Sequence, residues 1–150
     1  MFKISIIISI IALISSCNEK LGEEIKGRYP NGTPIKVNYF KWVGNDKIVV
    51  KEIRYYQNGE KEIEGEYKNG GKHGKWTYWY NNGKKWSEGT FKNDLSDGHF
   101  TIWYKSGKRN YEAEYKEGKP NGKWIFYDND DVKYKEVIFD MGEKIEEKNL

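Results

Sequence analysis

The sequence is poor in the residues that cross-link or fill most small domains. Its 150 residues include one cysteine, three prolines and only four leucines. A single cysteine excludes an internal disulfide framework and any zinc site built from several cysteines. The 26 basic and 23 acidic residues leave a net charge of +3, and so small an excess argues against a dedicated nucleic-acid binder.

Patterns that carry catalysis or bind metals are also missing. His73 and His99 have no neighbouring ligands at metal-binding spacing. The glycine-rich segment Gly65–Gly71 lacks the Lys and Ser or Thr of a phosphate-binding loop, and no serine lies in a Gly-x-Ser-x-Gly motif. We therefore expect no enzyme activity, no metal, no cofactor and no nucleic-acid partner.

Aromatic side chains are abundant instead. The chain has 6 Trp, 12 Tyr and 6 Phe, which together make 16% of its residues. With so few leucines, any core must be built from rings. No sustained 3.6-residue periodicity follows residue 20, so we expect little helix.

The first residues are typical of an export signal. An apolar run from Ile4 to Ile14 follows Lys3 and is too short to span a membrane. It ends in Ser15-Ser16-Cys17, which resembles the lipobox of bacterial lipoproteins. The resemblance implies that residues 1–16 are a lipoprotein signal peptide and that Cys17 is the lipid attachment point. An ordinary secretory signal followed by an incidental cysteine is the alternative.

These features predict where the chain resides. A lipidated Cys17 would partner the membrane and hold the protein in the cell envelope, outside the cytoplasm. In a Gram-negative host we expect the outer membrane. Residues 17–28 are mostly polar and are predicted to form a tether between the lipid and the domain.

The rest of the chain repeats with a step of 24 residues. Gly74, Gly98 and Gly122 show the step, and seven further columns of residues keep the same register. We predict one repeat domain over residues 29–142. Its parts are a partial leader (29–50) and four units (about 51–73, 74–97, 98–121 and 122–142), followed by a polar C-terminal tail (143–150).

Each unit reads as a β-hairpin. Residues 76–80 are rich in β-formers, Asn82-Gly83 favours a tight turn, and residues 85–91 form the return strand. A two-residue loop would place Trp76 opposite Gly89, whereas a three-residue turn with a bulge would shift the register and exchange the faces. The fold class is therefore all-β, an elongated single-layer antiparallel sheet of tandem hairpins.

These residues bring the chain close to a known family. Residues 63–76, with Gly65-Glu66-Tyr67 followed by Gly70 and Gly74, look like a MORN repeat. The 24-residue unit is closest to the bacterial MORN-variant proteins, many of which are named YwqK-type antitoxins. The resemblance implies a repeat scaffold that binds a partner, and it says little about which partner.

Two columns are candidate functional features. Rings recur in a candidate binding stripe at Tyr55, Trp79, Trp103 and Tyr127. Carboxylates recur in a candidate structural ladder at Glu64, Glu88, Glu112 and Glu136. Basic residues lie three positions before each Glu, and this odd spacing predicts that they occupy the opposite face of the sheet. The rings could equally be the packed face of a thin sheet.

Three functions fit the sequence. The first is a non-enzymatic, membrane-anchored lipoprotein whose repeats form a binding or scaffolding surface for a protein partner. The second is an antitoxin or immunity protein that neutralises a cognate toxin. The third is a peripheral lipid or glycan binder that uses the stripe of Tyr55, Trp79, Trp103 and Tyr127.

Overall fold

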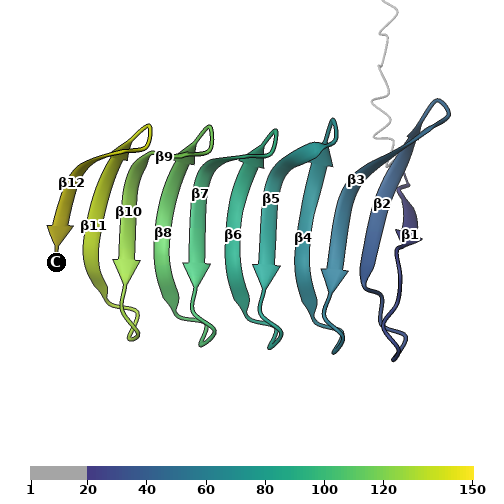
Figure 1. The fold of residues 1–150 in the computed structure, drawn as a ribbon, viewed down its shortest axis with the longest axis horizontal. Helices are drawn as coiled ribbons and strands as arrows, with labels where there is room; N and C mark the ends of the chain where they lie inside the picture. Colours follow the sequence, from purple (N-terminus) through teal and green to yellow (C-terminus); the bar gives the residue numbers. More distant parts are fainter. Residues whose placement is uncertain (1–19) are drawn as a thin grey trace, which may run out of the picture.

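The computed structural model describes residues 20–150, which form one antiparallel sheet of twelve strands without helices (Figure 1). The proposed signal peptide and Cys17 lie outside the described residues. The strands are β1 (Gly22–Ile25), β2 (Lys36–Val43), β3 (Asp46–Tyr55), β4 (Lys61–Lys68), β5 (Gly71–Trp79), β6 (Lys85–Lys92), β7 (Leu95–Trp103), β8 (Arg109–Lys116), β9 (Lys119–Pro120), β10 (Gly122–Tyr127), β11 (Lys133–Asp140) and β12 (Glu143–Asn149).

The sheet is a series of consecutive hairpins. Each strand pairs with the strands before and after it in the sequence, with one exception. The short β9 pairs only with β8, and β10 therefore pairs with β8 and β11. Figure 1 shows the strands side by side in chain order along the length of the molecule. The predicted fold class, a single-layer all-β repeat sheet, is confirmed.

Both ends of the predicted domain are longer than expected. Residues 143–149, assigned to a polar tail, form β12 and pair with β11. Part of the predicted tether also forms a strand, because β1 pairs with β2 from Gly22 opposite Phe40 to Ile25 opposite Val37. The described chain is therefore sheet from residue 22 almost to its end.

The predicted register holds in the middle of each hairpin. Trp76 lies opposite Gly89 and Tyr78 opposite Ser87. The equivalent pair in the next unit, Phe100 opposite Ala113, is also formed. Trp76, Tyr78 and Phe100 therefore lie on one face of the sheet.

Of the two predicted turns, the three-residue turn with a bulge forms, but it does not exchange the faces as predicted. The Tyr80 amide donates to the Lys84 carbonyl at 2.8 Å, and the Gly83 amide donates to the Tyr80 carbonyl at 3.0 Å. The loop thus has three residues, with Gly83 in the left-handed region at φ 78°. Such a loop alone would exchange the two faces of the sheet.

A β-bulge restores the register one residue beyond the turn. Trp79 lies opposite Lys85 while Tyr78 lies opposite Ser87, so Trp86 is an extra residue on the return strand. The same irregularity recurs at the equivalent place in the other hairpins. The extra residues, which we call the bulge column, are Glu62, Trp86, Asn110 and Tyr134.

The bulge column determines which residues share a face, and it corrects the predicted face of the basic residues. Trp86 packs on Tyr78 with ring centroids 5.9 Å apart, so it lies on the face of Trp76. The basic residue before each bulge moves the other way. Lys61 and Lys85 therefore lie on the same face as Glu64 and Glu88, to which they are ion-paired.

One face, which we call the aromatic face, holds most of the rings. Most neighbouring rings on it contact each other edge-on or tilted, as between Trp76 and Phe91, whereas Tyr111 and Trp124 are stacked. The rings of the aromatic face include Tyr67, Trp76, Tyr78, Trp86, Phe91, Phe100, Tyr111, Tyr115, Trp124, Phe126, Tyr134 and Phe139.

Glycine makes room for the rings on the preceding strand. The Trp76 ring lies flat over Gly65, and the Phe100 ring lies over Gly89, so a Cβ at either glycine would overlap the ring. The buried Trp76 indole also donates to the Glu66 carbonyl at 3.0 Å. These contacts explain why a strand interior accepts a residue with poor β-propensity.

This packing predicts how adding one methyl group at Gly89 changes the stability of the protein. Gly89→Ala should lower the free energy of unfolding by about 1–3 kcal/mol, because the new Cβ overlaps the Phe100 ring. Urea unfolding measures the loss. The same substitution should cost less in a Phe100→Leu background, and the exposed Lys92→Ala on the same strand is the control. Equal losses in both backgrounds would contradict the contact.

Candidate binding surface

The face opposite the aromatic face carries the predicted ladder, and we call it the ladder face. Glu64 accepts a hydrogen bond from Lys61 at 2.6 Å and also pairs with Lys51. One unit later, Glu88 pairs with Lys85 at 2.6 Å and with Lys75 at 3.0 Å. Each carboxylate is therefore held between two cations, one from its own strand and one from a neighbouring strand.

The same cations cover the predicted aromatic stripe. The Lys61 ammonium lies 5.7 Å from the Trp79 ring centre, and the Lys85 ammonium lies 5.5 Å from the Trp103 ring centre. Both rings are half-buried. A cation of one unit thus contacts both the carboxylate of its own unit and the ring of the next.

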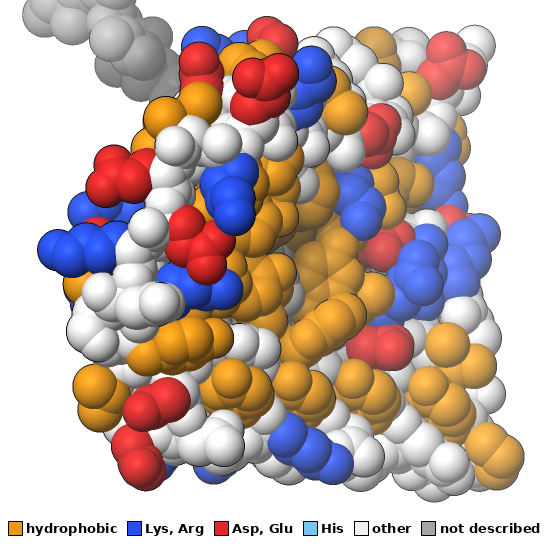
Figure 2. Space-filling view, turned by 60° about the vertical axis from the view of Figure 1, so that its left-hand side comes forward, with side chains coloured by type: hydrophobic (Ala, Val, Ile, Leu, Met, Phe, Trp, Pro, Cys, Tyr) orange, Lys and Arg blue, Asp and Glu red, His pale blue; other side chains and the backbone are white. Residues whose placement is uncertain are grey.

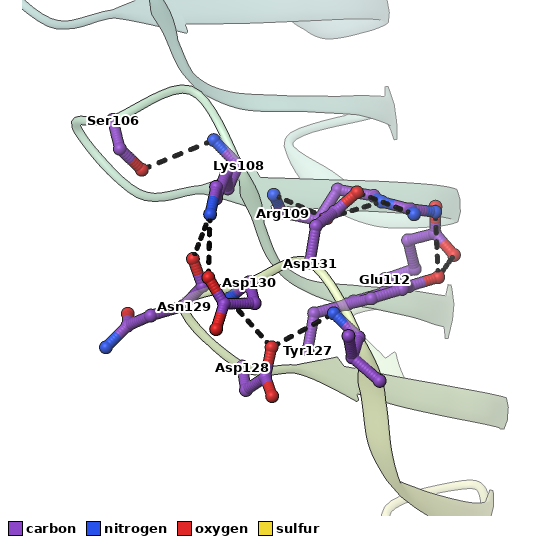
Figure 3. A network of polar contacts seen from close by, with 10 residues as sticks. Ser106, Lys108, Arg109, Glu112, Tyr127, Asp128, Asn129, Asp130 and Asp131 are labelled. Carbon is purple, nitrogen blue, oxygen red and sulfur yellow. Dashed lines mark hydrogen bonds and ion pairs between the residues drawn. The ribbon is translucent and has the colours of Figure 1, made fainter.

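The third repeat of this arrangement is the most extensively hydrogen-bonded (Figure 3). The Arg109 guanidinium lies 4.0 Å from the Tyr127 ring centre and donates to both carboxylate oxygens of Asp131, at 3.0 and 2.9 Å. The Tyr127 hydroxyl donates to Glu112 at 2.6 Å. Burial and this bond to Glu112 raise the pKa of Tyr127 to about 12, so the hydroxyl stays protonated and remains a donor.

The stripe is therefore not an open row of rings. Tyr127 is only 1% exposed, so its ring is not available to a partner. Tyr55 is half-buried like Trp79 and Trp103. The last member of the ladder, Glu136, pairs with Lys123 at 3.3 Å. The structure brings the predicted stripe and ladder together as one set of contacts between units.

A second set of contacts between units lies at the turns, and sequence reasoning missed it. The Tyr56 hydroxyl donates to the Trp79 carbonyl at 2.7 Å, and the Tyr80 hydroxyl donates to the Trp103 carbonyl at 2.9 Å. The Asn58 amide likewise donates to the Asn81 carbonyl of the next turn. The tyrosine column was visible in the sequence, but its backbone acceptors were not.

The aromatic face is uncovered, as the ladder face is. No second layer of described residues covers it, because residues 20–150 form a single sheet. Trp86 is 47% exposed and Tyr134 is 45% exposed, and both belong to the bulge column. Figure 2 shows hydrophobic side chains gathered in a broad band over one face of the sheet, with Lys, Arg, Asp and Glu side chains at its borders.

The aromatic face changes character at its N-terminal end. Where later units have Trp76, Phe100 and Trp124, the first hairpin has Glu52, which is 24 residues before Trp76. Glu52 is 2% exposed, and its carboxylate pairs with Lys36 at 2.7 Å and with the Arg54 guanidinium at 3.1 Å. This departure from the repeat pattern was the sequence signal for a distinct site.

A pocket of about 800 Å³ opens above Glu52. Strands β2 and β3 line it on one side, and the end of β4 with its turn lines it on the other. Tyr67 reaches the pocket from β4 and packs edge-on against Trp76, with ring centres 5.2 Å apart. The pocket is therefore continuous with the aromatic face, and we call it the N-terminal pocket.

The polar groups of the pocket differ in whether they have partners. Burial raises the pKa of Glu52, but the hydrogen bond and charge of Lys36 and the charge of Arg54 outweigh this effect and hold the pKa below its ordinary value. Burial and the Glu52 charge raise the pKa of Tyr67 to about 12. The Asn38 side chain is 8% exposed, and its Oδ1 atom has no hydrogen-bond partner.

Comparison with known proteins identifies the repeats. Residues 49–69, 72–93 and 96–117 match the family of the MORN repeat variant. No curated protein sequence matches the chain significantly. Three of the hairpins described above are thus similar to MORN-variant repeats, and such repeats suggest a binding or scaffolding role.

The described part of the chain offers little for other site types. Residues 20–150 contain no group of three His, Cys, Asp or Glu side chains placed to hold a metal ion. The same residues include no helix that is long and apolar enough to cross a membrane.

The ion pairs of the ladder face predict acid sensitivity. Burial raises the pKa of Glu64 and Glu88, but their lysine hydrogen bonds outweigh it and hold both pKa values below the ordinary 4.5. The stability they contribute is present above that pH and is lost as the pH falls through the folded pKa values. The free energy of unfolding should therefore drop below pH 4.5, by less than about 1 kcal/mol per pair.

Glutamine variants test whether Glu64 and Glu88 cause this loss of stability in acid. Glu64→Gln/Glu88→Gln should show a shallower acid loss than the wild type in urea unfolding across the acid range. The matched control is Glu143→Gln/Glu146→Gln in the exposed strand β12. An unchanged slope in the first variant would contradict the assignment.

Asp131 offers a test of the backbone strain that accompanies the Arg109 network. It has φ 66° at the position where earlier units have Gly59, Gly83 and Gly107. Asp131→Ala loses the Arg109 bonds and keeps the strained backbone, whereas Asp131→Gly loses the same bonds but relaxes the backbone. Thermal unfolding should therefore rank the glycine variant above the alanine variant, and the reverse order would refute this account.

Proposed function

We propose that this chain is a non-enzymatic, lipid-anchored binding or scaffolding protein of the bacterial cell envelope, and that its aromatic face contacts a protein partner. The observation that carries the proposal is the aromatic face itself, which spans the repeats and is covered by no second layer of described residues. Large apolar patches of this kind mark interaction sites on soluble domains. Trp and Tyr, the exposed rings of the bulge column, are the residues most often found at interface hot spots.

The charges of the ladder face support the proposal that binding occurs on the aromatic face. Glu64, Glu88 and Glu112 are all neutralised by nearby cations. Such pairs are alike from unit to unit and do not provide the differentiated acid and base that catalysis requires. The ladder face therefore holds the units together and leaves the aromatic face for binding.

The two other functions have no comparable support. A lipid or glycan binder would have to use the aromatic stripe as its contact surface. Trp79 and Trp103 lie under lysines, however, and Tyr127 is buried. An antitoxin role is compatible with a protein-binding face, and no contact among the described residues favours a toxin over another protein.

The anchor is tested at Cys17. Cells fed radiolabelled palmitate should label the wild-type protein and not Cys17→Ser, and the variant should leave the membrane fraction. Globomycin, which inhibits lipoprotein signal peptidase, should cause the precursor to accumulate. An unlabelled wild-type protein would refute lipid anchoring and leave the binding proposal standing.

The binding face is tested with exposed rings. In cells, cross-linking the full chain should capture a partner that is lost in Trp86→Ala/Tyr134→Ala, because both exposed rings lie on the aromatic face. Leu95→Ala is the matched control, since Leu95 is similarly exposed but lies at the turn between β6 and β7. Circular dichroism confirms that each variant folds. Capture that survives the ring substitutions would contradict the proposal.

A further inference from the structure

The N-terminal pocket combines three features that later units lack. Its floor is polar, with Asn38 and the paired Glu52, while later units have aromatic rings at the equivalent of Glu52. Its side walls include Val43, Ile48 and Val50 from the hairpin of β2 and β3. A volume of about 800 Å³ lies within the range of pockets that bind ligands.

The floor lacks a hydrogen-bond donor. Asn38 is buried, and its Oδ1 accepts no hydrogen bond among the described residues. Glu52 cannot supply the donor, because its ionised carboxylate is itself an acceptor, paired with Lys36 and Arg54. Leaving a buried acceptor unpaired costs free energy. The Oδ1 atom is closed to solvent in this conformation, so the Asn38 side chain gains a hydrogen bond if it turns this atom toward an occupant of the pocket that supplies an N–H or O–H group.

The lining has an excess of positive charge. Lys36, Lys41, Lys47 and Lys68 line the pocket, and Glu52 is the one carboxylate among its lining residues. Lys36 is neutralised by Glu52, and Lys47 pairs with Glu24. Lys41 and Lys68 form no ion pair within residues 20–150. An occupant that carries carboxylates would complement these two ammonium groups.

The position of the pocket indicates the class of occupant. A polar floor argues against an acyl chain, which would need an apolar end to its pocket. Tyr67 connects the pocket to the aromatic face through Trp76. A partner that lies on the aromatic face can therefore extend a segment into the pocket.

We propose that the N-terminal pocket binds an acidic peptide segment of the protein partner. The Asn38 side chain turns to accept a hydrogen bond at Oδ1 from a backbone amide of the segment. The acidic side chains of the segment lie against Lys41 and Lys68, and its apolar side chains pack on Val43 and Ile48. This inference rests on the proposed function, because it identifies what the partner presents at one end of the aromatic face.

The experiment uses a displayed library of random short peptides, selected on the full chain in mild detergent. Selected peptides should be richer in Asp and Glu than the starting library, and their affinity should fall as salt is raised. One selected peptide is then synthesised with a fluorophore, and its dissociation constant is measured by fluorescence polarisation.

Two pocket variants decide the role of the site. Asn38→Leu should weaken binding by about tenfold, the value of one hydrogen bond of 1.4 kcal/mol, while thermal stability stays the same or rises because an unpaired buried acceptor is removed. Lys41→Glu/Lys68→Glu should weaken it at least as much. The matched control is Lys92→Glu/Lys116→Glu. It reverses the charge of the two lysines that are equivalent to Lys68 in the next two units and that lie outside the pocket.

Other outcomes overturn the proposal. It is wrong if no acidic peptides are enriched, or if the pocket variants bind the peptide as tightly as the control does. Binding of N-acetylglutamate with the affinity of the peptide would replace it with a small-anion site, and pocket-dependent binding of phosphatidylglycerol vesicles would replace it with a lipid site.

Failure here can be told apart from failure of the proposed function. If the Trp86→Ala/Tyr134→Ala variant loses the cross-linked partner but selection finds no acidic peptide, the aromatic face stands and the pocket assignment fails. If acidic peptides bind the pocket but the cross-linked partner is indifferent to the ring substitutions, the aromatic-face proposal fails instead.

Discussion

One extra residue in each return strand determines what both faces of the sheet present. The three-residue turn by itself would exchange the faces, and the bulge that follows reverses the exchange within two residues. Between the two irregularities, Lys61 and Lys85 are brought onto the face of their glutamates. Beyond the bulge, rings return to the aromatic face. The bulge residue itself can vary, and in two units it is Trp86 or Tyr134, which adds an exposed ring to the binding face.

Because the sheet has one layer, the units are held together mainly by contacts with their immediate neighbours. Backbone pairing joins them along the strands, the cation and ring contacts join them on the ladder face, and the Tyr80 hydroxyl and its equivalents join them at the turns. Stability in such an array is approximately a sum over neighbouring units. Opening of a terminal unit therefore leaves the central units intact, and the N-terminal pocket lies in one such terminal unit.

The sequence predicted the fold and the central register, because the 24-residue period records both directly. Opposite residues such as Trp76 and Gly89 repeat together, so their pairing could be read from the columns. The turn could not, since Asn82-Gly83 suits a two-residue loop as well as the three-residue loop that forms. The face of Lys61 was missed for the same reason, because spacing along a strand predicts a face only where no bulge intervenes.

The candidate site was harder to predict. The stripe and ladder columns were found, but only coordinates show that lysines cover Trp79 and Trp103. The sequence does not predict the pocket, because the partial leader (29–50) that supplies most of its lining departs from the repeat pattern. Glu52 in a column of rings was the available signal, but its burial and the neighbouring Asn38 come from a hairpin whose pairing the period does not encode.

The last strand has a consequence for how the molecule behaves among its own copies. A row of like hairpins is in effect a polymer, and the free edge of its final strand could accept another copy and grow into a fibre. Strand β12 is exposed throughout, and its sequence from Glu143 to Asn149 consists of charged residues apart from Ile145 and Asn149. Adding a copy would place these charges in a new strand pair. The charges of β12 thus disfavour growth of the sheet by addition of another copy at this edge.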